Sequence, residues 1–430
     1  MNYDLIIVGG GPAGTSLAVR VAASGMQVLL LEKDVFPARS VVSCSLFLSH
    51  GMRLLDEIGV TEDLYALENI KLRGAALEVH DYFRTFVPMP DDDGRNYVYG
   101  IDREKLDTAI WERARQCPNV TAMDGFHVSD IRQRDGHVWV IGTRKGGEEL
   151  EFTASRMVGA DGRHSLVARK VGAATTHEVV EWNTAVFYAY WDGVKPYLCA
   201  GEPWVQIHTT GKGRSTVVMP SASGRTGILV QCRATDFHRD SDLKKWYTDF
   251  LHDLPKVAQR LEQAEIVTPI KGMKNVQNLF RTPAGAYWVL VGDAYHQKDS
   301  YDAQGIYDAL FGAKVLSKHL HSWFSGDTTW EQAMHAYGEE VAQHMEPMFA
   351  STMERLKREM FTDVPPMAAK TAMRWMLTNR DYVDRFGESM IRKIDPMTWS
   401  TPGLLVRALL TGLFSDARAL FLGTPKDGVN

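Results

Sequence analysis

The sequence predicts an α/β protein: a Rossmann-like nucleotide-binding sheet, an antiparallel β-sheet domain and a helical C-terminal region. Three observations predict this fold. A strand, a glycine turn, a helix and a second strand follow one another within residues 3–32. Strand-like runs occupy most of residues 184–270. Helical patterns then dominate after residue 327.

Composition and charge narrow the function classes. The 430 residues are 45% hydrophobic and 23% charged, as in ordinary globular proteins. The formal net charge is -5, and no block of basic residues occurs. Because nucleic-acid binding needs a basic surface, we exclude nucleic acid as a partner.

The cysteines and the chain ends predict a reduced, cytoplasmic protein. The four cysteines (Cys44, Cys117, Cys199 and Cys232) form no CxxC pair and no cluster with metal-ligand spacing, so we expect free thiols and no metal site. The start, MNYDLIIVGGG, leaves no room for a secretion signal. The apolar segment 401–423 is interrupted by charged residues, so we expect a helix that closes the fold rather than an integral membrane segment. A membrane-surface helix is the alternative.

The N-terminal motif predicts a site for a dinucleotide. An apolar strand ending at Val8 leads into a glycine turn, and a second strand ends at an acid. Gly9 permits the tight turn, Gly11 lets the backbone approach a pyrophosphate, and Gly14 lets the helix pack closely. The free N–H groups of the helix attract phosphate, and Glu32 can accept hydrogen bonds from a ribose. The predicted cofactor contacts are Gly9, Gly11, Pro12, Ala13, Gly14, Glu32 and Lys33.

Two later segments repeat the pattern of an apolar strand, a Gly-Asp or Asp-Gly pair and a helix. These are ASRMVGADGRHSLVARKVG (154–172) and VLVGDAYHQKDSYDAQGIYDAL (289–310). With the glycine turn, they resemble the three-part fingerprint of flavoprotein monooxygenases of the aromatic-hydroxylase type (group A). That group is related to geranylgeranyl reductases and flavin-dependent halogenases. The resemblance implies a glutathione-reductase-type FAD-binding domain.

The resemblance also implies further contacts with FAD. Arg103, in YGIDREKLDTAIWERA, is similar to an arginine that reaches the phosphate and ribityl region. Asp293 is similar to the acid that binds the ribityl chain, and the helix that begins near Gln304 is expected to point its N terminus at the N1/C2 edge of the isoalloxazine ring. The implied positions are Arg103, Asp161, Gly162, Gly292, Asp293, Gln304, Gly305 and Ile306.

The chain departs from this family at three places. Ser300 replaces the proline of the loop after Asp293, and Ala303 replaces the glycine that often precedes the helix. The segment FPARSVVSCSLFLSHG lacks the usual arginine-glycine pattern. Cys44 and Ser45 are therefore candidates to lie near the ring, although a small buried cysteine is the simpler interpretation.

The order of motifs predicts three regions. Residues 1–75, 97–175 and 275–345 are assigned to the FAD-binding domain, 76–96 and 176–274 to a substrate-binding β-sheet domain, and 346–430 to the helical C-terminal region. Within the second region we expect a hairpin at residues 211–213, a helix pair broken at Pro255, and a solvated turn at 91–94. Its aromatic residues (Phe187, Tyr188, Tyr190, Trp191 and Trp204) would suit a flat apolar substrate, although we expect most of them to be ordinary sheet packing.

The resemblance implies an FAD-dependent monooxygenase. It would hydroxylate an aromatic or polyketide-like molecule through a flavin C4a-hydroperoxide, with NAD(P)H as a transient reductant and O2 as the oxidant. His296 is the candidate general base, with a structural histidine as the alternative. A flavin-dependent halogenase, a C=C reductase, and a flavin binder without turnover remain open, as do a flavin reductase partner and the oligomeric state. The segment EPWVQIHTTG lacks the full WxWxIP pattern of halogenases.

Overall fold

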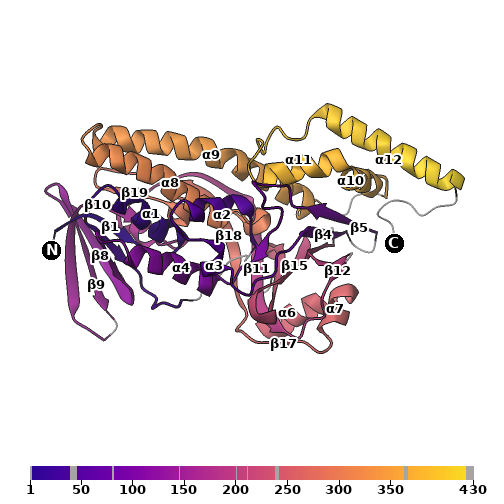
Figure 1. The fold of residues 1–430 in the computed structure, drawn as a ribbon, viewed down its shortest axis with the longest axis horizontal. Helices are drawn as coiled ribbons and strands as arrows, with labels where there is room; N and C mark the ends of the chain where they lie inside the picture. Colours follow the sequence, from indigo (N-terminus) through magenta and orange to yellow (C-terminus); the bar gives the residue numbers. More distant parts are fainter. Residues whose placement is uncertain are drawn as a thin grey trace.

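The computed structural model describes residues 2–38, 46–79, 82–144, 146–199, 201–210, 212–237, 242–362 and 367–422. Two β-sheets lie side by side, and a layer of long helices covers one side of both (Figure 1). The mixed α/β fold with a helical C-terminal region, predicted from the sequence, is confirmed.

The first sheet carries the nucleotide-binding topology. Its order is β7-β2-β1-β10-β9-β8, and β19 pairs with β10. The parallel strands are β1 (Asn2–Val8), β2 (Val28–Leu31), β7 (Val120–Met123), β10 (Glu149–Gly159) and β19 (Trp288–Leu290), whereas β8 (Phe126–Arg134) and β9 (His137–Arg144) form an antiparallel edge. Residues 5–8 of β1 and the whole of β2 are continuous apolar runs because both faces of this part of the sheet are covered.

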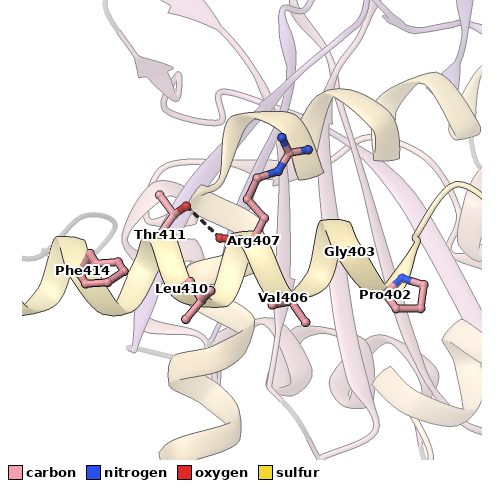
Figure 2. A pocket seen from close by; sticks show the side chains of 7 residues that line it. All are labelled: Pro402, Gly403, Val406, Arg407, Leu410, Thr411 and Phe414. Carbon is pink, nitrogen blue, oxygen red and sulfur yellow. Dashed lines mark hydrogen bonds between the residues drawn. The ribbon is translucent and has the colours of Figure 1, made fainter.

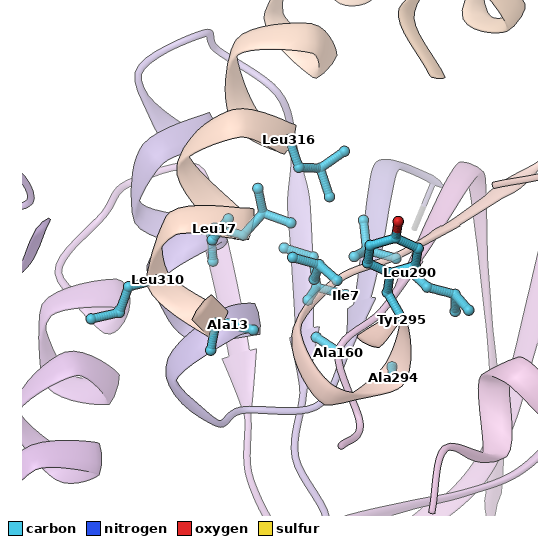
Figure 3. Packing of buried hydrophobic residues seen from close by; sticks show 14 of the residues in the cluster. Ile7, Ala13, Leu17, Ala160, Leu290, Ala294, Tyr295, Leu310 and Leu316 are labelled. Atoms are coloured by element: carbon cyan, nitrogen blue, oxygen red, sulfur yellow. The ribbon is translucent and has the colours of Figure 1, made fainter. Parts of the chain in front are cut away.

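Helices α1 (Pro12–Ala22), α4 (Arg103–Arg115) and α8 (Gly305–Phe324) pack together beside this sheet. Figure 3 shows Ala13 and Leu17 of α1 beside Leu310 of α8 and Ile7 of β1. This packing brings the N-terminal ends of α1 and α8 to the same edge of the sheet, where nucleotides bind in such folds.

The second sheet is mostly antiparallel and runs β20-β18-β11-β16-β15-β14-β4-β5. Its strands are β4 (Gly74–Val79), β5 (Phe83–Pro88), β11 (Thr175–Asp192), β14 (Val205–Thr209), β15 (Arg214–Pro220), β16 (Thr226–Arg233), β18 (Lys271–Arg281) and β20 (His296–Gln297), with β17 (Glu265–Ile266) beside β11. Strands β14 and β15 form the hairpin that the glycines indicated. Because β18 and β20 belong to this sheet, it extends beyond the expected limit at residue 274.

The aromatic residues of β11 divide between the two faces of the second sheet. Phe187 and Trp191 pack against α6 (Leu243–His252) and α7 (Pro255–Leu261), the helix pair broken at Pro255. Tyr188 lies in the cluster on the opposite face. Phe187 and Trp191 are therefore sheet-packing residues, because successive residues of a strand point to opposite faces and these two face the helix pair.

The helical layer continues through α9 (Trp330–Glu359), α10 (Met367–Thr378), α11 (Arg380–Met390) and α12 (Pro402–Leu422). Helices α10 and α11 contact β5, so the C-terminal region covers the end of the second sheet (Figure 1). The remaining elements are short: β3 (Leu46–Phe47), α2 (Ser49–Asp56), α3 (Glu62–Tyr65), β6 (Tyr99–Gly100), α5 (Leu166–Lys170), β12 (Leu198–Cys199) and β13 (Glu202–Pro203).

The turn at 91–94 is not fully solvated, contrary to expectation. The Asp92 side chain is buried and lies 2.7 Å from Arg53 Nη1, so it anchors the turn to α2.

Among the residues that the structure describes, no helix is long and apolar enough to cross a membrane.

Candidate functional site

The glycine turn between β1 and α1 is shaped for close approach of a ligand. Gly9 has φ +111°, and a Cβ there would lie 2.3 Å from the carbonyl oxygen of Ala160. A Cβ on Gly14 would lie 1.9 Å from the carbonyl oxygen of Gly9. A Cβ on Gly11 would meet no atom within 4 Å. Gly9 and Gly14 are therefore required by the fold itself, whereas the space beside Gly11 is open to a ligand.

The first turn of α1 has backbone amides that no side chain caps. Gly11 is the N-cap residue and provides no side-chain cap, and Pro12 begins the helix. Ala13 is buried, so the ligand-facing groups of this turn are backbone amides. Such amides and the positive end of the helix dipole attract phosphate.

Glu32, at the end of β2, is tied to the glycine turn. Its Oε2 accepts a hydrogen bond from the Gly10 amide at 2.5 Å, and its Oε1 accepts one from the Asp34 amide at 3.0 Å. Burial raises the pKa of Glu32, and these two hydrogen bonds oppose that rise. The carboxylate therefore fixes the turn, and its contact with a ribose stays a prediction. Lys33 follows on the exposed surface.

The Asp161-Gly162 motif follows β10 and adjoins the glycine turn through Ala160. The Asp161 carboxylate accepts hydrogen bonds from Ser165 Oγ at 2.5 Å and from the amides of Leu166 and Val167 at 2.6 and 3.1 Å. It thus caps α5. Burial raises its pKa against these bonds. The structure gives the Asp161 side chain a structural role, while its backbone lies beside the predicted phosphate site.

Gly292 and Asp293 complete the same edge. Gly292 has φ +62°, and a Cβ there would lie 2.9 Å from the Cβ of Ala13. Asp293 forms an ion pair with Arg163 Nε at 3.1 Å. Arg163 Nη2 also donates to the carbonyl oxygen of Lys298 at 2.9 Å. The three sequence motifs therefore converge at one place, joined by an arginine that the sequence analysis did not select.

These residues fit a flavin dinucleotide. Beside the open space at Gly11 and the uncapped first turn of α1, Arg163 Nη1 is buried with no hydrogen-bond partner among the described residues. Such a donor is available to a ligand or a water molecule. The donors suit an anionic, phosphate-bearing group, and the order of motifs suits FAD.

The N terminus of α8 is the second helix end at this site. Gly305 is exposed with open space around it, whereas Ile306 is buried. Ala303 has φ +54° and ψ +33°, the left-handed conformation that a glycine would adopt without strain. Replacement of the family's glycine by Ala303 therefore preserves the backbone course, at a conformational cost.

Gln304 uses its side chain within the protein. Its Nε2 donates to the carbonyl oxygen of Met390 at 2.9 Å, and its Oε1 lies 3.2 Å from both His50 Nε2 and Arg392 Nε. Only the backbone of Gln304 is thus left to meet a cofactor. This residue links the start of α8 to the segment after α11.

A buried ionic network surrounds that link. Asp308, in the first turn of α8, pairs with Lys298 and with Arg392 Nη2, the latter at 3.0 Å. Burial alone would raise the pKa of Asp308, but Lys298 and Arg392 outweigh it and lower the pKa to about 2. Sequence reasoning missed Lys298, Asp308 and Arg392. The position of Asp308 in the first turn of a predicted helix was a weak signal for its pairing with Lys298. Nothing in the sequence indicated Arg392.

Arg103 is the first residue of α4 and lies near Tyr188 and Tyr190 of the second sheet. It forms a bidentate pair with Asp107, with distances of 3.1 and 2.8 Å. Burial alone would lower the pKa of Arg103, but Asp107, and more weakly Tyr188 and Tyr190, raise it above its ordinary value. Arg103 is therefore held charged and rigid near the inner face of the second sheet.

His296 does not match the role of a general base. It is buried on β20 and contacts Phe280, Tyr295 and Phe349, with ring centroids 4.4 to 6.5 Å apart. Burial lowers its pKa to about 3. A histidine in this setting is neutral at physiological pH and packs as an aromatic residue, which is the structural alternative considered above.

The inner face of the second sheet is a partly buried apolar surface. Its accessible side chains are Tyr188, Ile207, Val217 and Met273, and Tyr190 lies beside Tyr188 with ring centroids 6.1 Å apart. Lys271 is directly opposite Tyr188 in the β11–β18 register, so it shares this face. Trp204 packs on Phe86, with ring centroids 5.0 Å apart.

Cys44 and Ser45, which were candidates to lie near the ring, are outside the described residues. The described residues contain no cluster that could hold a metal ion.

Comparison with known proteins agrees with this geometry. In sequence, the chain is 25% identical over 344 residues to a 1H-pyrrole-2-carbonyl-(peptidyl-carrier protein) chlorinase of Pseudomonas fluorescens, covering 74% of this chain and 75% of that protein. It is 32% identical over 181 residues to 6-methylpretetramide 4-monooxygenase of Streptomyces rimosus, covering 40% and 41%. In structure, it resembles the flavin-dependent brominase Bmp2 with a TM-score of 0.79, 18% identity and coverage of 96% and 99%.

The family assignment rests on a match along most of the chain. A family model described as an FAD binding domain matches residues 2–352, which include all three motifs and both sheets. The chain therefore belongs to the FAD binding domain family of FAD-dependent oxidoreductases.

Proposed function

We propose that the protein is an FAD-dependent monooxygenase that hydroxylates an aromatic or polyketide-like small molecule with NAD(P)H and O2. The observation that carries this proposal is the apolar surface of Tyr188, Ile207, Val217 and Met273, which adjoins Arg103 at the predicted cofactor site. FAD, when bound, would supply the redox chemistry that activates O2.

The residues of the chain would bind, orient and exclude water. The amides at the start of α1 would hold phosphate, and Arg163 would add a charged donor through Nη1. The open N terminus of α8 at Gly305 would favour negative charge on the cofactor. Tyr188 and Tyr190 would hold a flat ring against the inner face of the second sheet.

A relative that matches part of the chain supports hydroxylation. The match to 6-methylpretetramide 4-monooxygenase has the higher identity of the two sequence relatives, although it spans less than half of each chain. Burial lowers the pKa of His296 to about 3, so we assign it no role as a base. An electron-rich aromatic ring is the substrate class that attacks an electrophilic oxygen.

The test measures reduction of the flavin first and incorporation of oxygen into the product second. The FAD-loaded protein is mixed anaerobically with NADH or NADPH, with and without a panel of phenols, and bleaching of the flavin band is recorded. We expect bleaching that an aromatic ligand accelerates, and a product with one added oxygen atom after O2 is admitted. Failure of both nicotinamides to bleach the flavin with every ligand would contradict a self-contained monooxygenase.

Halogenation is the second candidate function, and Lys271 is the observation that favours it. A flavin-dependent halogenase needs a lysine on the substrate side, and Lys271 shares the face of Tyr188. The chlorinase relative is consistent with this alternative. With flavin reductase, bromide and O2 supplied, a brominated product that disappears in Lys271→Met, while oxygen consumption continues, would establish halogenation. Hydroxylated product from Lys271→Met would instead support the monooxygenase.

A further inference from the structure

Helix α12 exposes an apolar stripe that nothing in the described chain covers. Seven large apolar side chains are between 49% and 91% exposed: Val406, Leu410, Leu413, Phe414, Leu420, Phe421 and Leu422. Figure 1 places α12 at the outer edge of the helical layer, at the end far from the first sheet. Soluble monomers seldom expose an apolar patch larger than a few hundred Å2.

The opposite face of α12 is already used. Leu404, Ala408 and Ala419 are buried, and α12 packs against α10 and α11. A Cβ on Gly412 would lie 2.1 Å from Trp375, so the small residues of this face permit close helix packing. Arg374 and Asp416 form a buried ion pair that fixes the rotation of α12 about its axis. The exposed stripe is therefore held outward by the fold.

The stripe has the spacing that a partner helix requires. Val406, Leu410, Leu413, Ala417 and Leu420 follow one another at intervals of four and three residues. This alternation is the heptad pattern of helices that pair along one seam. From Val406 to Leu420 the stripe is about 20 Å long, on a helix of 21 residues.

A shallow groove lies on the same face. It has a volume of about 510 Å3 and is lined by Pro402, Gly403, Val406, Arg407, Leu410, Thr411 and Phe414. Figure 2 shows Pro402, Val406 and Leu410 on one side of the helix and Arg407 on the other. Arg407 lies 3.4 Å from Asp381 of α11, so this charge borders the stripe without interrupting it.

We propose that α12 pairs with α12 of a second copy of this chain, through the stripe formed by Val406, Leu410, Leu413, Phe414 and Leu420. The five side chains of the stripe carry no charge, so the same stripe on two copies can meet across a two-fold axis, with Arg407 and Arg418 at its border. From the fractional exposures, the five side chains of the stripe present on the order of 600 Å2 per copy, or about 1,200 Å2 for the pair, which is the lower end of the range for specific interfaces.

The charge pattern favours a second copy over a bilayer surface. Helices that lie on membranes carry lysine and arginine along their polar face. The basic residues of α12 are two, the exposed Arg407 and Arg418, and Arg407 is paired with Asp381. The face of α12 opposite the stripe is packed against α10 and α11. The net charge of -5 also opposes approach to anionic lipid. This proposal does not depend on the proposed monooxygenase activity.

The test is the oligomeric state of the full FAD-loaded chain by sedimentation velocity over a range of concentrations. We expect a reversible dimer for the unchanged protein. The double variant Leu410→Lys/Leu413→Lys should weaken the dimer by at least about 100-fold, because both copies would bury charges at the centre of the seam. Leu64→Lys, at a 53% exposed leucine of α3, is the matched control and should leave the dimer intact.

Three results would overturn the proposal. These are a monomer at every concentration, a dimer that persists unchanged in the double variant, or a monomer that floats with phosphatidylcholine and phosphatidylglycerol vesicles through the same residues. The last result would assign the stripe to a lipid surface. At a concentration at which both variants are monomeric, the double variant should unfold at the same temperature as the control because the substituted side chains are exposed, and this separates loss of pairing from loss of fold.

Discussion

Arg392 Nη2 donates to Asp308 Oδ1 at 3.0 Å, although 84 residues separate them in the chain. Arg392 follows α11 in the C-terminal region, and Asp308 lies in the first turn of α8. Arg392 also donates to Gln304 Oε1 at 3.2 Å and to the carbonyl oxygen of His344 at 3.1 Å. The C-terminal region is thus anchored at the helix end that the flavin is expected to meet.

Removal of Arg392 should destabilise the protein strongly. In Arg392→Met, Asp308 keeps only Lys298, and Gln304 loses one of its donors. Loss of one partner from a buried charged network costs about 3–5 kcal/mol. Chemical denaturation of the FAD-free protein measures this change. Arg380→Met, at a side chain that is 93% exposed, is the control and should shift stability by less than about 0.5 kcal/mol. Equal stability of the two variants would contradict the role of the network.

Gly11→Ala should separate cofactor binding from folding. The added methyl meets no protein atom within 4 Å, so the stability of the FAD-free protein should change little. It would occupy the space expected for the pyrophosphate, and we expect FAD to bind at least about tenfold more weakly. Fluorescence titration with FAD measures the affinity. Gly403→Ala, which also meets no atom within 4 Å, is the matched control and should bind FAD as the unchanged protein does.

Ala303→Gly should stabilise the fold. Ala303 holds a left-handed conformation with φ +54°, which costs a residue with a side chain about 1–2 kcal/mol and glycine almost nothing. Part of this gain is offset by the greater freedom of glycine in the unfolded chain, so the expected net gain is about 0.5–1 kcal/mol. Urea denaturation measures it. Ala303→Val should move stability in the opposite direction, and a gain from valine would refute the assigned conformation.

Stability should fall as the pH decreases below neutrality. Burial lowers the pKa of His50 and of His296 to about 3, below the value of about 6.5 in the unfolded chain. The unfolded state therefore binds more protons between pH 6.5 and 3, so each histidine destabilises the folded state progressively in this window. From pH 7 to pH 5 the expected loss is about 2 kcal/mol for each residue.

His296→Phe tests the share of one histidine, because phenylalanine suits the cluster of Phe280, Tyr295 and Phe349. The change in unfolding free energy between pH 7 and pH 5 should be about 2 kcal/mol smaller in this variant than in the unchanged protein. His335→Phe, at an exposed histidine, should leave the pH dependence as it is. Identical pH profiles for His296→Phe and the unchanged protein would show that His296 is not buried in neutral form.

Local patterns were sufficient for the motifs but not for their side-chain partners. The glycines at 9, 11 and 14 and the helix that follows them were predicted because each requirement is local: a turn, a close approach and a free helix end. Asp161 and His296 were selected by position within a motif. Their actual contacts, with the amides of α5 and with a cluster of aromatic rings, depend on neighbours that spacing does not specify.

The sequence by itself determined an α/β fold that begins with a glycine turn suited to a dinucleotide, because period and turn chemistry act over short distances. The resemblance of its three motifs to a flavoprotein family implied that the dinucleotide is FAD. Only the tertiary structure decided that Arg163 joins Asp293 to the Lys298 loop, that Arg392 reaches Asp308, and which face of β11 is free. Buried charges find partners wherever the fold brings opposite charge close, and that distance is independent of separation along the chain.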